Sequence, residues 1–135
     1  MFCVHVHGRW REMGRVAQYA PVPESIRAAR LMVGESLRPG DDADLAAVLT
    51  AELSSNAVDH AATPFTVAVG HEKGGALIVE VHDDDPTLPV MVPAGPESPR
   101  GRGLVLVDAF SQDWGVEMTH EDGKRVWFRL APLDD

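Results

Sequence analysis

Glu52, Asn56 and His60 recur at intervals of four residues in a segment rich in strong helix formers. At that spacing their side chains lie on one face of a helix. The apolar stripe that leads to them consists of Leu45, Val48 and Leu49. A carboxylate and a carboxamide that continue a buried stripe are costly unless they are paired or face a pocket. The pattern therefore predicts either a ligand pocket beside Glu52 and Asn56 or a solvated edge of the helix.

A second group of polar residues ends an apolar strand, where Asp83, Asp84 and Asp85 precede Pro86. One interpretation is a solvated start of a loop, since aspartate before proline is common in turns. The other is that Asp83 points into a pocket and accepts a hydrogen bond there, while Asp84 and Asp85 belong to the loop.

The third feature is a Gly-x-Gly pair, Gly101 and Gly103, flanked by Arg100 and Arg102 at the predicted start of a helix. Bare backbone amides at the positive end of a helix dipole can bind phosphate, and the arginines add positive charge. The alternative is an ordinary turn. The segment lacks the third glycine of a dinucleotide fingerprint and the Gly-Lys-Ser/Thr of a phosphate-binding loop.

Hydrophobic periodicity and turn residues predict the elements that position these groups. Helices are expected from about residue 23 to 37, from 41 to about 62, and from 102 to 110, and strands at 15–20, 65–69, 77–81, 114–118 and 125–130. A turn is expected at 71–75 and a proline-rich loop at 84–101. This order predicts an α/β (α+β) two-layer sandwich, with a mixed, mainly antiparallel sheet and helices on one face. Residues 1–14 fit a leader or an edge strand, and 15–135 one domain.

Composition limits the classes of function. The 135 residues include 12 Lys and Arg against 21 Asp and Glu, which leaves a formal net charge of −9. Such a surface repels nucleic-acid backbones and anionic lipid, so we expect neither nucleic acid nor membrane as a partner. No apolar run approaches the roughly 20 residues that span a bilayer. The lone Cys3 cannot form an intrachain disulfide, which suits a cytoplasmic protein.

The order and spacing of these motifs resemble the histidine-kinase-like ATPase superfamily of gyrase, MutL, the heat-shock chaperone and histidine kinases. The matching segments are ELSSNAVDHA at 52–61, VHD at 81–83, and RGRGL at 100–104. The chain looks most like small actinobacterial ATP-binding proteins related to anti-sigma-factor serine kinases. The resemblance spans roughly residues 15–131 and implies a Bergerat-type ATP-binding fold.

The resemblance also implies roles for individual residues. Asn56 matches the asparagine that coordinates Mg²⁺ bridging the triphosphate, and Glu52 matches the general base. Asp83 matches the aspartate that accepts the adenine amino group. The segment 84–100 occupies the place of the ATP lid. Further nucleotide contacts are implied for His60, Arg100, Gly101, Arg102, Gly103 and Leu104.

The implied activity is that of an ATP·Mg²⁺-dependent serine/threonine protein kinase in a partner-switching pathway. It would bind a sigma factor or an anti-sigma-factor antagonist and phosphorylate a serine on the antagonist. Two departures favour an alternative, a protein-binding module of the same fold that transfers no phosphoryl group. Residues 84–86 replace glycines that shape the adenine pocket, and Arg125 replaces a threonine that helps to bind adenine. A homodimer is left open.

Overall fold

The computed structural model describes residues 2–6, 9–88, 102–119 and 123–133. Along the chain its elements are β1 (Phe2–Val6), β2 (Arg9–Tyr19), α1 (Glu24–Glu35), α2 (Ala43–Asn56), the π-helix η1 (Ala57–Ala61), β3 (Phe65–His71), β4 (Leu77–Asp83), α3 (Arg102–Phe110), β5 (Asp113–Met118) and β6 (Lys124–Leu130). The predicted succession of helices and strands is confirmed, and β1 corresponds to the edge strand that is one of the two alternatives for residues 1–14.

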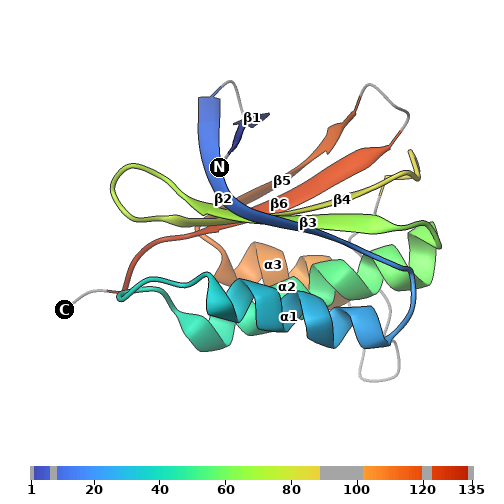
Figure 1. Cartoon of the computed structure of the whole chain (residues 1–135), viewed down its shortest axis with the longest axis horizontal. Coiled ribbons are helices and arrows are strands. Elements are labelled where there is room, and N and C mark those ends of the chain that lie inside the picture. The colour runs from blue at the N-terminus through green and yellow to red at the C-terminus, as the bar shows by residue number, and fades with distance from the viewer. Residues whose placement is uncertain (1, 7–8, 89–101, 120–122, 134–135) are drawn as a thin grey trace.

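The strands form one six-stranded sheet in the order β1-β2-β3-β4-β6-β5. The three α-helices cover one face of this sheet (Figure 1). The predicted α+β two-layer sandwich with helices on one face is therefore confirmed.

Every neighbouring pair of strands in the described sheet is antiparallel, so the expected mixed pairing does not occur there. Helices α1 and α2 form a two-helix connection, so the chain returns to the end of the sheet where β2 finished, and Tyr19 pairs with Phe65. The single helix α3 leaves β4 and β5 running in the same direction, but β6 lies between them.

Short-range signals set the ends of the helices. Helix α1 begins directly after Pro23, with Glu24 in its first turn, where a carboxylate suits the helix dipole. Helix α2 is capped by Asp42, whose Oδ1 accepts a hydrogen bond from the Leu45 backbone N–H at 3.1 Å. In the turn after β3, Gly74 and Gly75 adopt positive φ angles of 106° and 101°, which only glycine adopts at little cost.

Alternate residues of the strands point to the helices and form the core. In β3 these are Phe65, Val67 and Val69, each at most 1% exposed, and Phe128 of β6 is fully buried among them. The helices contribute the small and apolar residues Ala29, Met32, Val33, Ala46, Leu49 and Leu53.

The N-terminal hairpin lies on the side of the sheet away from the helices (Figure 1). Strand β1 forms the edge of the sheet, and the register of β2 on β3 shifts between Met13 and Arg15. Met13 is fully buried in a second small cluster with Ala68 and Ile78. Strand β2 thus spans residue 14, and the irregularity in its pairing with β3 falls at that position.

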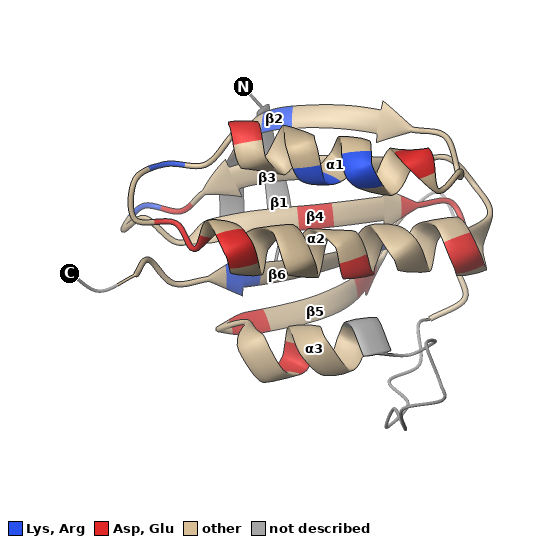
Figure 2. Cartoon of the chain, turned by 90° about the horizontal axis from the view of Figure 1, so that it is seen from below, with Lys and Arg blue, Asp and Glu red and all other residues tan. Residues whose placement is uncertain are grey.

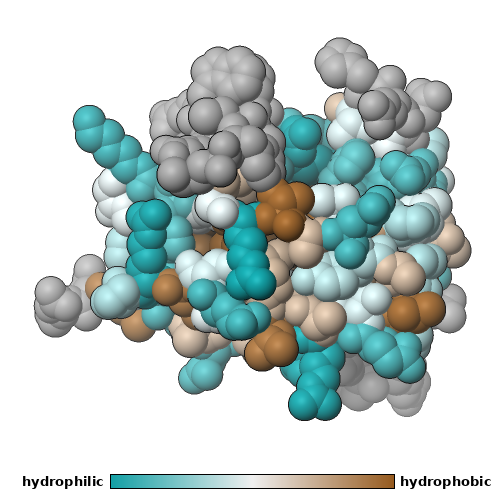
Figure 3. Space-filling model, viewed as in Figure 1, coloured by the Kyte–Doolittle hydropathy of each residue, from teal (hydrophilic) through white to brown (hydrophobic). Residues whose placement is uncertain are grey.

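Some large hydrophobic residues of the described chain are exposed. In the view of Figure 3 hydrophobic residues are divided from one another by hydrophilic ones. The exposed apolar side chains of the helix layer include Leu31, which is 65% exposed, and Val48. Among the described residues, no helix combines the length and the apolar character that a membrane span requires.

We predict that Gly123→Ala destabilises the fold, because a Cβ at Gly123 would overlap the backbone oxygen of Asp83. The atoms that this Cβ would meet all belong to the backbone, so relieving the overlap requires a shift of the backbone of β4 or β6. The free energy of unfolding should fall by about 1–3 kcal/mol in urea denaturation. The matched control is Gly34→Ala in α1, where a Cβ meets nothing within 4 Å. There alanine should stabilise the helix by up to about 1 kcal/mol. Equal effects of the two substitutions would contradict the proposed close approach.

Candidate functional site

Several of the residues that the sequence analysis singles out lie on described elements that end or begin near one end of the sandwich. The C-terminal ends of α2 and β4 and the beginning of α3 lie on the same side of the molecule (Figure 2). The π-helix η1 contacts β4. The backbone N–H of Asp84 also donates to Thr63 Oγ1 at 3.1 Å, which ties the end of β4 to the residues that follow η1.

The buried face of α2 differs from the predicted stripe. Its buried residues are Ala46, Leu49, Thr50, Leu53 and Ser54. Val48, which the periodicity predicts to be buried, is 47% exposed, whereas Ala46 is fully buried. Glu52 and Asn56 are half-buried and lie on the flank of the helix, not on its core-facing stripe.

The end of this helix is wound differently from the prediction, which continued it to about Ala62 with His60 one turn beyond Asn56. Helix α2 ends at Asn56 and passes into η1, where the Ala62 N–H donates to the Ala57 oxygen at 3.2 Å. A π-helix spaces its residues differently from an α-helix, so the interval of four no longer fixes a common face. His60 is exposed, and Ala62 ends the turn with a left-handed φ of 54°.

Asp83, the last residue of β4, is 3% exposed and points to the helix layer. The Lys124 Nζ lies 3.0 Å from Asp83 Oδ1, and these side chains are 7% and 4% exposed. The backbone N–H of Asp85 donates to the same oxygen at 2.9 Å. No hydrogen bond from the described residues ends on Oδ2 of Asp83. One carboxylate oxygen is therefore fixed by two donors, while the other has acceptor capacity to offer a ligand.

Sequence reasoning missed Lys124. Its ammonium also donates to the Asp85 backbone oxygen at 3.0 Å, so it fixes both Asp83 and the start of the following loop. The signal was present in the alternation of β6, whose residues 124, 126, 128 and 130 are all buried. Its contact with Asp83 depends on the cross-strand register, which pairs these two residues.

Arg125, counted as a departure from the family pattern, lies on the opposite face of the sheet from Lys124, since successive strand residues alternate. Its Nε is 3.2 Å from Glu80 Oε1, and its Nη1 is 3.3 Å from Glu117 Oε2. The arginine thus takes part in ion pairs behind the sheet and does not enter the space beside Asp83.

The segment 100–104, which the sequence analysis predicts to bind phosphate, is described in part. Arg102 and Gly103 form the first turn of α3. Leu104 is 2% exposed, and its side chain belongs to the core. Arg100, Gly101 and residues 89–100 of the predicted lid lie outside the described residues.

Where the lid segment is described, its first residues carry negative charge. Asp84 is exposed, and the Thr87 backbone N–H donates to Asp85 Oδ1 at 2.8 Å. This backbone hydrogen bond lowers the pKa of Asp85, and a hydrogen bond with the Thr87 side chain lowers it further by a smaller amount. Asp85 therefore stays ionised well into the acidic range. No cluster of three or more His, Cys, Asp or Glu suited to a metal occurs in the described parts of the chain.

We predict that Lys124→Met removes 3–5 kcal/mol, in order of magnitude, from the free energy of unfolding, because it leaves the Asp83 carboxylate buried without its cation. The double variant Asp83→Leu with Lys124→Met removes both charges and should regain most of that loss. Chemical denaturation of the two variants and of the parent measures this difference. Additive losses in the double variant would mean that the two side chains do not stabilise each other.

Comparison with known proteins places the chain in a family. No protein-family model matches it. Over 91 residues it is 40% identical to the uncharacterized protein SCO4941 of Streptomyces coelicolor, and the match covers 62% of this chain and 86% of that protein. The chain therefore belongs to the same protein family as SCO4941 of Streptomyces coelicolor.

Proposed function

We propose that this chain is an ATP·Mg²⁺-binding regulatory protein of the histidine-kinase-like ATPase superfamily, similar to the anti-sigma-factor serine kinases. In this proposal it acts in the cytoplasm on a sigma factor or on an anti-sigma-factor antagonist, and it phosphorylates a serine of the antagonist. The motifs at 52–61, 81–83 and 100–104 suggest the superfamily, and a two-layer sandwich that gathers their described residues at one end is compatible with it.

The observation that carries the proposal is the state of Asp83. A carboxylate that is 3% exposed has one oxygen fixed by Lys124 and Asp85, and its other oxygen receives no hydrogen bond from the described residues. This second oxygen keeps acceptor capacity for a donor from a ligand or from water. The exocyclic amino group of adenine is a donor of the required kind.

In this proposal, Asn56 and Glu52 act at the triphosphate end of the nucleotide. Mg²⁺ binds hard oxygen ligands and is commonly held by one or two protein groups together with phosphates and water. The half-buried carboxamide of Asn56 fits that role, because its neutral oxygen adds no repulsion to the triphosphate. Glu52, four residues earlier on the same flank, would accept the proton of a serine hydroxyl. The serine oxygen bonds to the γ-phosphorus as the bond to ADP breaks.

The second candidate is a binding module of the same fold that transfers no phosphoryl group. The negative charges of Asp84 and Asp85 directly after the pocket favour it, since they repel a triphosphate. The ammonium of Lys124 forms its ion pair with a third carboxylate, that of Asp83. The two candidates differ in phosphoryl transfer and not in fold, so they can be separated by variants of Glu52 and Asn56.

We predict that ATP·Mg²⁺ raises the melting temperature of the chain. A ligand at 100 times its Kd adds about 2.7 kcal/mol, which corresponds to several degrees in a domain of this size.

Asp83→Asn should weaken ATP binding about tenfold or more by calorimetry, because a charged hydrogen bond is lost. Purine riboside triphosphate, which lacks the amino group, is the control ligand and should bind both proteins almost equally. Equal affinity of ATP for the parent and for Asp83→Asn would contradict the proposed contact between Asp83 and adenine.

The roles of Asn56 and Glu52 predict two different defects. Asn56→Ala should weaken ATP binding and make the remaining affinity insensitive to Mg²⁺. Glu52→Gln should leave binding nearly unchanged but lower phosphoryl transfer by roughly 10²–10⁴, as expected for a lost general base. Radiolabelled ATP with a candidate antagonist protein measures transfer. If the parent binds ATP without transfer to any antagonist, and Glu52→Gln changes nothing, the binding module is correct and the kinase is wrong.

A further inference from the structure

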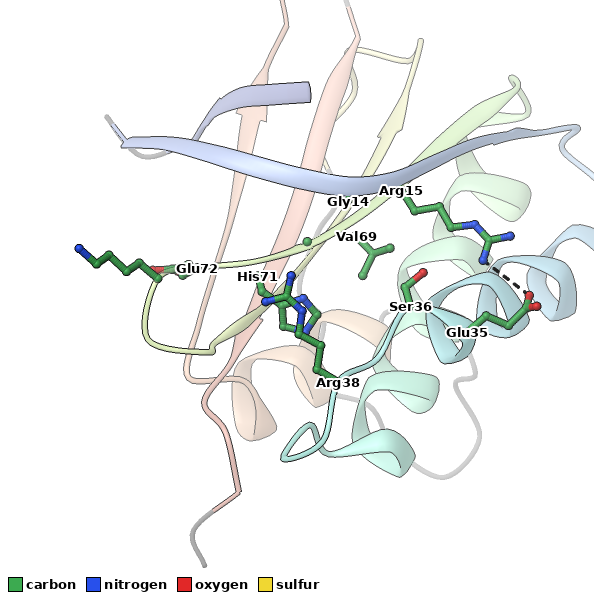
Figure 4. A pocket seen from close by; sticks show the side chains of 10 residues that line it. Gly14, Arg15, Glu35, Ser36, Arg38, Val69, His71 and Glu72 are labelled. Carbon is green, nitrogen blue, oxygen red and sulfur yellow. Dashed lines mark ion pairs between the residues drawn. The ribbon is translucent and has the colours of Figure 1, made fainter. Parts of the chain in front are cut away.

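A cavity of about 610 Å³ lies at the other end of the sheet and contains none of the residues discussed above for nucleotide binding. It is lined by the bulge of β2 at Gly14, the residues that follow α1 and the end of β3 (Figure 4). Asp83 faces Phe65 at the first residue of β3, whereas His71 at its last residue lines the cavity. Six steps along a strand separate these positions by about 20 Å.

The cavity gathers positive charge in a chain whose formal net charge is −9. Arg15, Arg38 and Lys73, three of the 12 Lys and Arg residues, line it from three different segments. Arg38 and Lys73 form no ion pair with any described residue. In Figure 4, Arg38 extends from the turn after α1 toward the end of β3 that carries His71.

The two acidic residues of the lining, Glu35 and Glu72, each lie beside an arginine. Glu35 Oε1 is 3.8 Å from Arg15 Nη1, a long contact between side chains that are 56% and 49% exposed. Such exposed pairs contribute little, so Arg15 can turn to a ligand at small cost. Glu72 Oε1 is 3.1 Å from Nε of Arg129, which belongs to the outer face of the sheet. The lining therefore presents an excess of cations to a ligand.

The backbone that carries Arg38 is fixed in advance. The Arg38 N–H donates to Asp41 Oδ2 at 2.7 Å, and the Asp41 N–H donates to the Arg38 oxygen at 3.0 Å. The same Oδ2 is 2.8 Å from His71 Nε2, and both of these side chains are 4% exposed. A buried contact thus joins the turn to β3, so binding a ligand requires little ordering of the chain.

We propose that this cavity binds a phosphorylated small molecule. A phosphate group presents oxygens in several directions and carries up to two negative charges, which suits cations that arrive from three segments, whereas a single arginine satisfies a planar carboxylate. The volume lies in the range of small-molecule sites, and the charged side chains of the lining favour a charged ligand. The site is independent of the proposed nucleotide site.

The test uses inorganic pyrophosphate as the probe, in calorimetric titrations of the full chain with EDTA at fixed ionic strength. Removing Mg²⁺ suppresses binding through Asn56. Arg38→Gln should weaken pyrophosphate binding about tenfold, as expected for the loss of a charge-assisted hydrogen bond. The control is Arg27→Gln, which makes the same charge change at an exposed position of α1 that does not line the cavity. It should change the affinity less than twofold.

Amide chemical shifts of Gly70 and His71, which line the cavity, should move on titration, and the melting temperature of Arg38→Gln should stay near that of the parent. Absence of pyrophosphate binding, or equal weakening by Arg27→Gln and Arg38→Gln, overturns the proposal. Binding of citrate without binding of pyrophosphate also overturns it, because the site would then favour carboxylates. Failure of ATP·Mg²⁺ to bind would contradict the proposed function and leave this result unaffected.

Discussion

The pairing of β4 with its two neighbours is the constraint on which both ends of the molecule depend. Asp83 at its last position stands opposite Phe65 of β3 and Lys124 of β6, and Leu77 at its first position stands opposite His71 and Leu130. Because side chains alternate between the faces of a strand, a slip of one residue would turn Asp83 and Lys124 away from the helices. The register is held by apolar residues between the two ends, which bury the helix-facing side of β3, β4 and β6.

The ion pair between Asp83 and Lys124 is buried, and this determines its energetic balance. Two charges that are removed from water cost several kcal/mol each, and mutual attraction offsets that cost only when further hydrogen bonds satisfy them. The Asp85 N–H and the Asp85 oxygen provide these bonds, one to each partner. A buried ion pair of this kind is weak evidence for a net gain in stability. Its clearer effect is to fix the Asp83 carboxylate in one orientation within the helix layer.

The two faces and the two ends of the sheet carry different electrostatics. Behind the sheet, Arg125 joins Glu80 to Glu117, and Arg129 joins Glu72 to Asp113, so these charges are compensated away from the helices. On the helix side, the end at Asp83 begins an acidic loop, whereas the opposite end gathers arginine and lysine around a cavity. The formal net charge of −9 describes neither end.

The sequence by itself determined the order of the elements and most of their ends, because these depend on local chemistry. Asp42 caps α2, glycines close the turn after β3, and alternating apolar residues mark β3 and β4. It also placed the acid of Asp83 at the end of a strand. Periodicity did not determine the exact face of α2, because that face depends on how the helix packs in the folded chain, where Ala46 is buried and Val48 is 47% exposed.

Only the tertiary structure decided which residues meet across the sheet. Lys124 is 41 residues from Asp83 in the sequence, and no local pattern indicates that its ammonium lies 3.0 Å from that carboxylate. The cavity near His71 likewise combines β2, the turn after α1 and the end of β3. Contacts between distant segments follow from strand register and from helix packing, which depend on the whole core at once and not on any short window of residues.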